Sequence, residues 1–220
     1  APPAAVINDA SFLGTLTHRD WIAGISEAFK VGAIGDVDFL WWLEDHAEVL
    51  FQRDADAMEA LIHRGATLHC QQISRGGDPF ELGSARPLDF GHWAAHKLEA
   101  LSGFELRHGE AVAVGIAIDL MYAAGVGYVA LDEATRVIAA MARCGLPVWH
   151  PALDDHHGSR LAVLAGLEEF RQHLGGKLHV TFPAPLGHRL EVNAIDEHGM
   201  THAIKRLAHV ARSMPKSPHP

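Results

Sequence analysis

The sequence has few cysteines and no long hydrophobic run. Cys70 and Cys144 are the only two cysteines among 220 residues, which is too few for a disulfide framework and favours a reducing compartment. No stretch of 18 apolar residues is present, so no transmembrane helix is expected. The first residues lack the charged-then-apolar pattern of a secretory leader. We therefore expect a cytoplasmic protein without a membrane partner.

Positive charge is also scarce. The chain carries 18 Lys and Arg against 27 Asp and Glu, for a formal net charge of -9 at pH 7. Surfaces that bind nucleic acid are normally rich in basic residues, so no nucleic-acid partner is expected. The glycine patterns G-x-G-x-x-G and G-x-x-x-x-G-K-[ST] are absent as well. The chain therefore shows no nucleotide-binding half of its own.

Apolar residues recur at helical spacing along most of the chain, and this predicts a mainly α protein. Helices are expected after Thr17, Asp36, Asp54, Asp89 and His108, and over residues 131–144, 161–173 and 201–212. Residues 74–84 and 151–158 are expected to be loops. Residues 177–183 and 188–194 read as two short strands joined by a turn, which would form a small β ribbon.

Histidine is abundant, with 17 residues, most of which are expected on the surface. Two of them open helical patterns: His92 follows Gly91, and His108 precedes Gly109. Glycine at a helix start lets the backbone approach a ligand, and the free amides there attract anions. His96 lies on the same helical face as His92. The pattern favours metal or anion chemistry, although His-x-x-x-His also arises by chance in so histidine-rich a chain.

Glu27 and Lys30 lie three residues apart on the first expected helix, so both project from one face. Glu27 would supply one carboxylate, and His92 and His108 would supply two imidazoles. Three protein ligands leave a position for substrate or water, as in catalytic zinc sites. The simpler alternative is that Glu27 is a surface carboxylate paired with Lys30.

Three sequence elements carry a resemblance to the 3-dehydroquinate synthase family, within the wider sugar-phosphate cyclases. The elements are Gly24-Ile-Ser-Glu27-Ala-Phe-Lys30, residues 89–99 (Asp-Phe-Gly-His-Trp-Ala-Ala-His-Lys-Leu-Glu), and residues 108–115 (His-Gly-Glu-Ala-Val-Ala-Val-Gly). They occur in the order typical of the family, and the sixteen-residue spacing of the two key histidines is kept. The resemblance covers nearly the whole chain but only the C-terminal half of the family's usual length.

The resemblance implies a helical C-terminal domain, with the N-terminal Rossmann-like NAD domain absent from this chain. Residues 1–212 would form a metal- and substrate-binding domain, and residues 213–220 a disordered tail. Zinc, or sometimes cobalt, would be held by Glu27, His92 and His108, while Lys30 and His96 would be catalytic and would contact the substrate.

The implied enzyme is a carbon–oxygen lyase. It oxidises a ring hydroxyl with bound NAD, eliminates phosphate, reduces the ketone and closes a carbocycle by aldol addition. The NAD-binding half would come from the same protein or a partner chain, and a homodimer is expected. The chain alone is expected to be inactive.

Departures from the synthase pattern bear on the substrate, a small sugar phosphate. Ala85 stands where the synthases have an arginine, with Arg86 one step away, and His69 stands where they have a lysine. Because those two cations hold the substrate carboxylate in the synthases, we expect a heptulose phosphate without a carboxylate, such as sedoheptulose 7-phosphate. The candidate substrate-binding residues are Lys30, His69, Arg86, Asp89, His96 and Arg171.

Two further readings stay open from the sequence. An iron-type alcohol or polyol dehydrogenase would share the two-domain layout, although its metal set usually begins with Asp and adds a third His. A non-catalytic helical module could instead keep the scaffold and bind a metal for stability or interaction.

Overall fold

In the computed structural model, the described residues are 5, 7–75 and 87–214. The helices are α1 (His18–Gly35), α2 (Val37–Asp45), α3 (Ala47–Phe51), α4 (Ala55–Arg75), α5 (His92–Leu101), α6 (His108–Gly125), α7 (Leu131–Arg143), α8 (Ala165–His173) and α9 (Glu197–Ser213). The strands are β1 (His156–His157), β2 (Arg160–Leu161), β3 (Val180–Pro183) and β4 (Arg189–Val192). Short 3-10 helices span Ala10–Thr15, Pro87–Asp89, Pro151–Asp154 and Ala162–Leu164. The mainly helical fold with a small β ribbon is confirmed.

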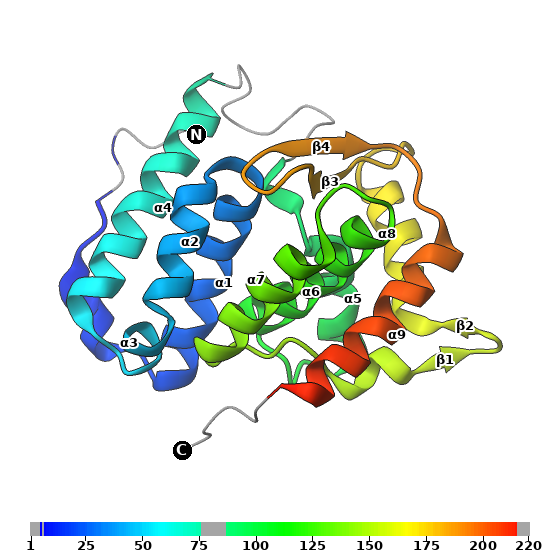
Figure 1. Cartoon of the computed structure of the whole chain (residues 1–220), viewed down its shortest axis with the longest axis horizontal. Helices are drawn as coiled ribbons and strands as arrows, with labels where there is room; N and C mark the ends of the chain where they lie inside the picture. The colour runs from blue at the N-terminus through cyan, green and yellow to red at the C-terminus, as the bar shows by residue number, and fades with distance from the viewer. Residues whose placement is uncertain (1–4, 6, 76–86, 215–220) are drawn as a thin grey trace.

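Helix α6 is the centre around which the other helices pack. Its residues from Ala111 to Ala123 are all buried. A helix that is apolar on every side needs neighbours on every side, and α6 is packed against α1, α5, α7 and α9. Figure 1 shows α6 in the middle of the molecule, with α9 beside it.

Two glycines of α6 allow unusually close contacts with neighbouring segments. A Cβ placed on Gly115 would lie 2.0 Å from the carbonyl oxygen of Gly91, which precedes α5. A Cβ placed on Gly109 would lie 2.3 Å from the carbonyl oxygen of Ala23 in α1. Any larger side chain at either position would push two segments apart. The starts of α5 and α6 and the middle of α1 are therefore held close together.

The predicted helix starts agree with the structure where the signal is local. The Thr17 side chain accepts a hydrogen bond from the Asp20 amide, and Asp36 accepts one from the Phe39 amide. Asp54 accepts from the Ala57 amide at the start of α4. These caps satisfy amides that have no partner inside the helix.

Several expected boundaries were wrong. The helix expected after Asp36 is divided at His46 into α2 and α3. Helix α9 begins at Glu197, four residues before the expected start, because the Asp196 side chain accepts from the amides of residues 198 and 199. Residues 151–158, expected to be a loop, contain a 3-10 helix and β1.

Of the loop expected at 74–84, the first two residues belong to α4, which continues to Arg75; residues 76–84 lie outside the described residues. Of the tail expected at 213–220, Ser213 belongs to α9. Residues 215–220 lie outside the described part of the chain.

The expected ribbon is formed by β3 and β4, which pair in antiparallel register with Val180 opposite Val192. All four residues of β3 are buried. Phe182 packs against Tyr122 of α6, with ring centroids 5.2 Å apart. Within the part of the chain that the structure describes, no helix combines the length and apolar character needed to cross a membrane.

Replacement of Gly115 by alanine tests the close contact between α6 and the start of α5. We expect Gly115→Ala to lower the free energy of unfolding by about 3 kcal/mol, the upper part of the usual range for overpacking, because its Cβ meets backbone. Gly125→Ala is the matched control, since a Cβ there meets nothing within 4 Å. Its effect should stay below about 1 kcal/mol. Urea unfolding measures both, and equal effects would contradict the contact.

Candidate metal centre

Glu27, His92 and His108 come together at the junction of α1, α5 and α6. One potential ligand atom from each lies within 4.8 Å of the others. His92 Nε2 is 4.0 Å from Glu27 Oε1, and the ring centroids of His92 and His108 are 5.4 Å apart. The structure thus brings the three predicted ligands together. That they hold a metal stays a prediction.

The His92 ring is fixed in the form that can bind a metal. Its Nδ1 lies 3.1 Å from the carbonyl oxygen of Phe90. A carbonyl can only accept, so Nδ1 carries the proton and Nε2 is left with a free lone pair. Burial, reinforced by the nearby Lys30 charge, lowers the pKa of His92 to about 4. His92 is therefore neutral near pH 7, as a metal ligand must be.

Glu27 and Lys30 form an ion pair at the same place, with Glu27 Oε2 2.5 Å from Lys30 Nζ. The lysine side chain is only 6% exposed, whereas that of Glu27 is 49% exposed. A buried ammonium is costly without a partner, so Glu27 satisfies Lys30 with one oxygen. Its other oxygen faces His92. The ion pair of the simpler alternative is therefore present, and the role of Glu27 as a metal ligand stays a prediction.

The start of α6, which carries His108, is tied to α1 by a second ion pair. Arg19 donates to both carboxylate oxygens of Glu110, at 2.5 and 2.6 Å. Such bidentate pairs fix geometry as well as distance. Glu110 also accepts from the amide of Arg107. Together these contacts fix His108 near α1 and hence near Glu27.

His96 and Glu99 border the centre on the α5 side. The His96 ring centroid is 5.8 Å from those of both His92 and His108. Glu99 Oε2 is 3.4 Å from His108 Nδ1, where it can orient the ring as outer carboxylates do at metal sites. Glu99 was not among the candidate site residues. Its position seven residues after His92, and so on the same helical face, was the available signal.

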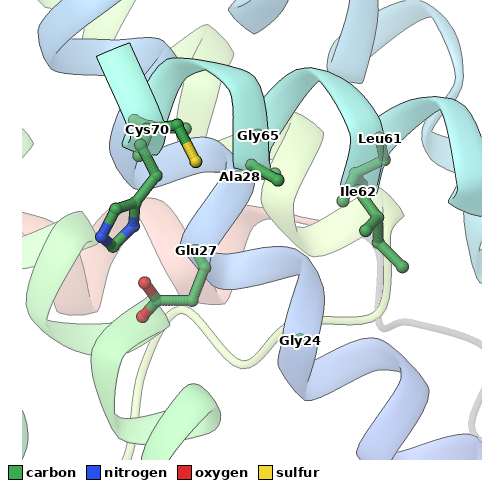
Figure 2. A pocket seen from close by; sticks show the side chains of 10 residues that line it. Gly24, Glu27, Ala28, Leu61, Ile62, Gly65 and Cys70 are labelled. Carbon is green, nitrogen blue, oxygen red and sulfur yellow. The ribbon is translucent and has the colours of Figure 1, made fainter. Parts of the chain in front are cut away.

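A pocket of about 370 Å³ opens beside Glu27, between α1 and α4. It is lined by Gly24, Glu27, Ala28, Val31, Leu61, Ile62, Gly65, Ala66, His69 and Cys70. Figure 2 shows Glu27 on α1, with Gly65 and Cys70 on the neighbouring helix α4. His69, a candidate substrate-binding residue, therefore shares this pocket with a candidate metal ligand.

The remaining candidate substrate-binding residues are less closely linked to the centre. Asp89 ends the 3-10 helix before α5 and is half-buried. Arg171 binds Glu168 and the carbonyl oxygen of Gly176, each at 2.6 Å, and both partners lie outside the centre. Its substrate contact gains no support from these bonds and stays a prediction. Arg86 lies outside the described residues.

Asp119 is a structural residue of the site that the sequence reading missed. It is fully buried in α6, where it is the one charged residue between positions 111 and 123. Its carboxylate accepts from the Gly91 amide at 3.0 Å and from Trp93 Nε1 at 2.8 Å. It thereby ties the first residues of α5, which flank His92, to α6. Burial raises the pKa of Asp119 to about 7 against the effect of these two donors.

Comparison with known proteins agrees with this geometry. The family model described as "3-dehydroquinate synthase C-terminal" matches residues 24–165. A curated 2-epi-valiolone synthase of Actinosynnema mirum is 31% identical over 212 residues, covering 93% of this chain and 53% of that protein. A 3-dehydroquinate synthase of Caulobacter vibrioides is 31% identical over 196 residues, covering 88% of this chain and 52% of that protein. The chain thus spans about half the length of these curated relatives.

Two solved structures share the fold. ValA, a 2-epi-5-epi-valiolone synthase from Streptomyces hygroscopicus subsp. jinggangensis 5008 with NAD⁺ and Zn²⁺ bound, is 27% identical with a TM-score of 0.82. The match covers 91% of this chain and 54% of that one. A 2-deoxy-scyllo-inosose synthase complexed with carbaglucose-6-phosphate, NAD⁺ and Co²⁺ is 16% identical, with a TM-score of 0.69. The match covers 90% of this chain and 55% of that one. Because the identity is low, this match supports the shared fold alone.

The buried Asp119 carboxylate should make stability depend on pH. Its folded pKa of about 7 exceeds the ordinary aspartate value of 3.8, so the folded state binds more protons than the unfolded state between these pH values. The contribution of Asp119 to the free energy of unfolding therefore falls by at most about 4 kcal/mol as the pH rises from about 4 to 7. His92, whose pKa is lowered to about 4, contributes the opposite slope over the range up to about 6.5.

The difference between wild type and Asp119→Asn isolates this effect, because His92 is present in both. We expect the stability of wild type relative to Asp119→Asn to fall across pH 4 to 7 and to level off above pH 7. Asp132→Asn, which changes an exposed carboxylate of α7, is the control and should show no such trend. Denaturant unfolding at several pH values measures all three proteins. A flat difference for Asp119→Asn would show that the raised pKa is wrong.

Proposed function

Since the chain belongs to the 3-dehydroquinate synthase C-terminal family, we propose that it is the metal- and substrate-binding part of a sugar-phosphate cyclase, a carbon–oxygen lyase. The observation that carries this proposal is the convergence of Glu27, His92 and His108 beside an open pocket. The solved structure of ValA contains NAD⁺ and Zn²⁺, which supports the same cofactors here. Cobalt is an alternative to zinc.

The donor set fits a divalent zinc or cobalt ion. One carboxylate oxygen and two imidazole nitrogens are typical ligands of zinc, and three protein ligands leave a position for substrate. His92 is already neutral and correctly oriented through Phe90. When bound, the ion would supply Lewis-acid polarisation of a substrate oxygen and lower the pKa of the hydroxyl that NAD oxidises.

Lys30 and His96 are placed for two different tasks in this chemistry. The buried Lys30 ammonium, held by Glu27, can donate hydrogen bonds to a substrate oxygen that lies against the centre. The His96 ring is exposed and stands beside both candidate histidine ligands. It is thus accessible to hydrogen-bond the phosphate of the substrate or to pass a proton to it.

For the substrate we propose a heptulose phosphate without a carboxylate, such as sedoheptulose 7-phosphate. In support, the chain has Ala85 and His69 where the synthases have the two cations that hold a carboxylate. His69 lines the pocket beside Glu27, where a neutral imidazole can bind hydroxyl groups. The NAD-binding part would come from elsewhere in the same protein or from a partner chain, and the assembly would be a homodimer.

Removal of any one proposed ligand should abolish tight metal binding at the centre. Glu27→Gln, His92→Ala and His108→Ala are each expected to weaken Zn²⁺ binding by more than about 100-fold, beyond the effect of an outer contact. His69→Ala is the matched control, because His69 lines the same pocket without being a proposed ligand. Titration calorimetry with Zn²⁺ measures the affinity. Unchanged affinity in the three ligand variants would refute the centre.

Turnover separates the proposed substrate from its alternatives. With NAD and Zn²⁺ present, the chain combined with its NAD-binding part should release phosphate from sedoheptulose 7-phosphate. It should do so at least about tenfold more efficiently than from the carboxylated heptulosonate phosphate, because a charge-assisted pair to the carboxylate is lacking. The chain alone should release none. Preference for the carboxylated sugar would overturn the substrate, and NAD-linked oxidation without phosphate release would favour the dehydrogenase reading.

A further inference from the structure

A second pair of histidines lies on α9, outside the candidate metal centre. His198 and His202 are four residues apart and both are exposed. Their Nε2 atoms are 3.0 Å apart. The rings meet edge to face, with centroids 4.5 Å apart and planes at 78°. The two imidazoles thus bring their Nε2 atoms close together at the surface.

The separation of these two nitrogens suits a shared metal ion. Imidazole nitrogens bind Zn²⁺ at about 2.0–2.1 Å. Two such bonds at an angle between a right angle and the tetrahedral value place the nitrogens roughly 2.8–3.4 Å apart. The observed 3.0 Å lies within that interval. The distance between the two nitrogens therefore fits an ion that both of them bind.

The surroundings of the pair are open and balanced in charge. Because both rings are exposed, water can fill the remaining coordination positions. The first turn of a helix disfavours a cation through its dipole, but the Asp196 and Glu197 carboxylates flank this turn. Glu197 is partly neutralised by Arg160, at 2.6 Å. His198 also lines a hollow of about 390 Å³.

The pair is separate from the centre that contains His108. The amide of Asp196, just before α9, donates to the hydroxyl of Tyr122 at 3.2 Å. Tyr122 lies fourteen residues after His108 along α6, which corresponds to about 21 Å at the rise of an α-helix. The two groups of histidines are thus near opposite ends of α6. No proposed ligand can serve both.

We propose that His198 and His202 form a second site for a divalent transition metal, with two protein nitrogens and water as ligands. The site would take Zn²⁺, Ni²⁺ or Cu²⁺, the ions that imidazole suits. A metal bound there links the first two turns of α9 and stabilises the folded chain by mass action. The competing explanation is a simple hydrogen bond between one protonated and one unprotonated ring nitrogen.

Zn²⁺ titration of chains that lack the main centre tests the site directly. In the His92→Ala/His108→Ala background, calorimetry should detect one Zn²⁺ equivalent, and adding His202→Ala should remove it. His209→Ala, which removes another exposed histidine of α9, is the matched control and should leave the equivalent in place. Circular dichroism shows that each variant is folded. Retention of the equivalent in the His202→Ala variant would overturn the proposal.

A second measurement uses a chain whose main centre is intact. Cu²⁺ added at two equivalents to wild type should give two electron paramagnetic resonance components, one from the main centre and one from the α9 pair with its two imidazole nitrogens, and His198→Ala/His202→Ala should lose the second component. The same double variant should still bind Zn²⁺ at Glu27, His92 and His108. The failure of this second site and the failure of the main centre are therefore distinguishable. A signal unchanged in the double variant would show that the α9 pair is only a hydrogen bond.

Discussion

The candidate centre depends on how closely three backbone segments approach one another around α6. Gly109 lets the start of α6 meet Ala23 of α1, and Gly115 lets α6 meet the carbonyl of Gly91. His108 is adjacent to Gly109, and His92 is adjacent to Gly91. The contacts that pack the helices therefore also set the positions of both imidazoles relative to Glu27. In this molecule the packing of the core therefore determines the geometry of the site.

Three ionisable groups are buried near this junction, and each is compensated in a different way. Lys30 is paired with Glu27, Asp119 accepts from two donors, and His92 becomes neutral. Burying a charge is costly unless it is paired or lost, so each arrangement follows from the local partners. Nε2 of the neutral His92 and Oε1 of the half-exposed Glu27 lie 4.0 Å apart. That combination agrees with the cation proposed for this site.

The sequence predicted what depends on local pattern and missed what depends on distant contacts. Thr17 and Asp36 were recognisable as caps because their partners lie three residues away. The proposed ligand set could be named because the spacing of its residues follows the family elements, and the structure brings the three residues together. Asp119 was missed because its partners Gly91 and Trp93 lie 28 and 26 residues away. The hairpin of β1 and β2 escaped prediction because two-residue strands carry no alternation to detect.

The two groups of histidines differ in how much of the fold each one requires. His198 and His202 are brought together by the pitch of α9 alone, since residues four apart share one face. His92 and His108 are brought together by the packing of α5, α6 and α1, and Glu27 is added from a third segment. Metal binding at the main centre would therefore be coupled to the global fold, because the proposed ligands separate when the helices do. Binding at α9 is coupled mainly to the order of one helix. A metal at the main centre should consequently stabilise the whole domain, whereas a metal at α9 acts on its own segment.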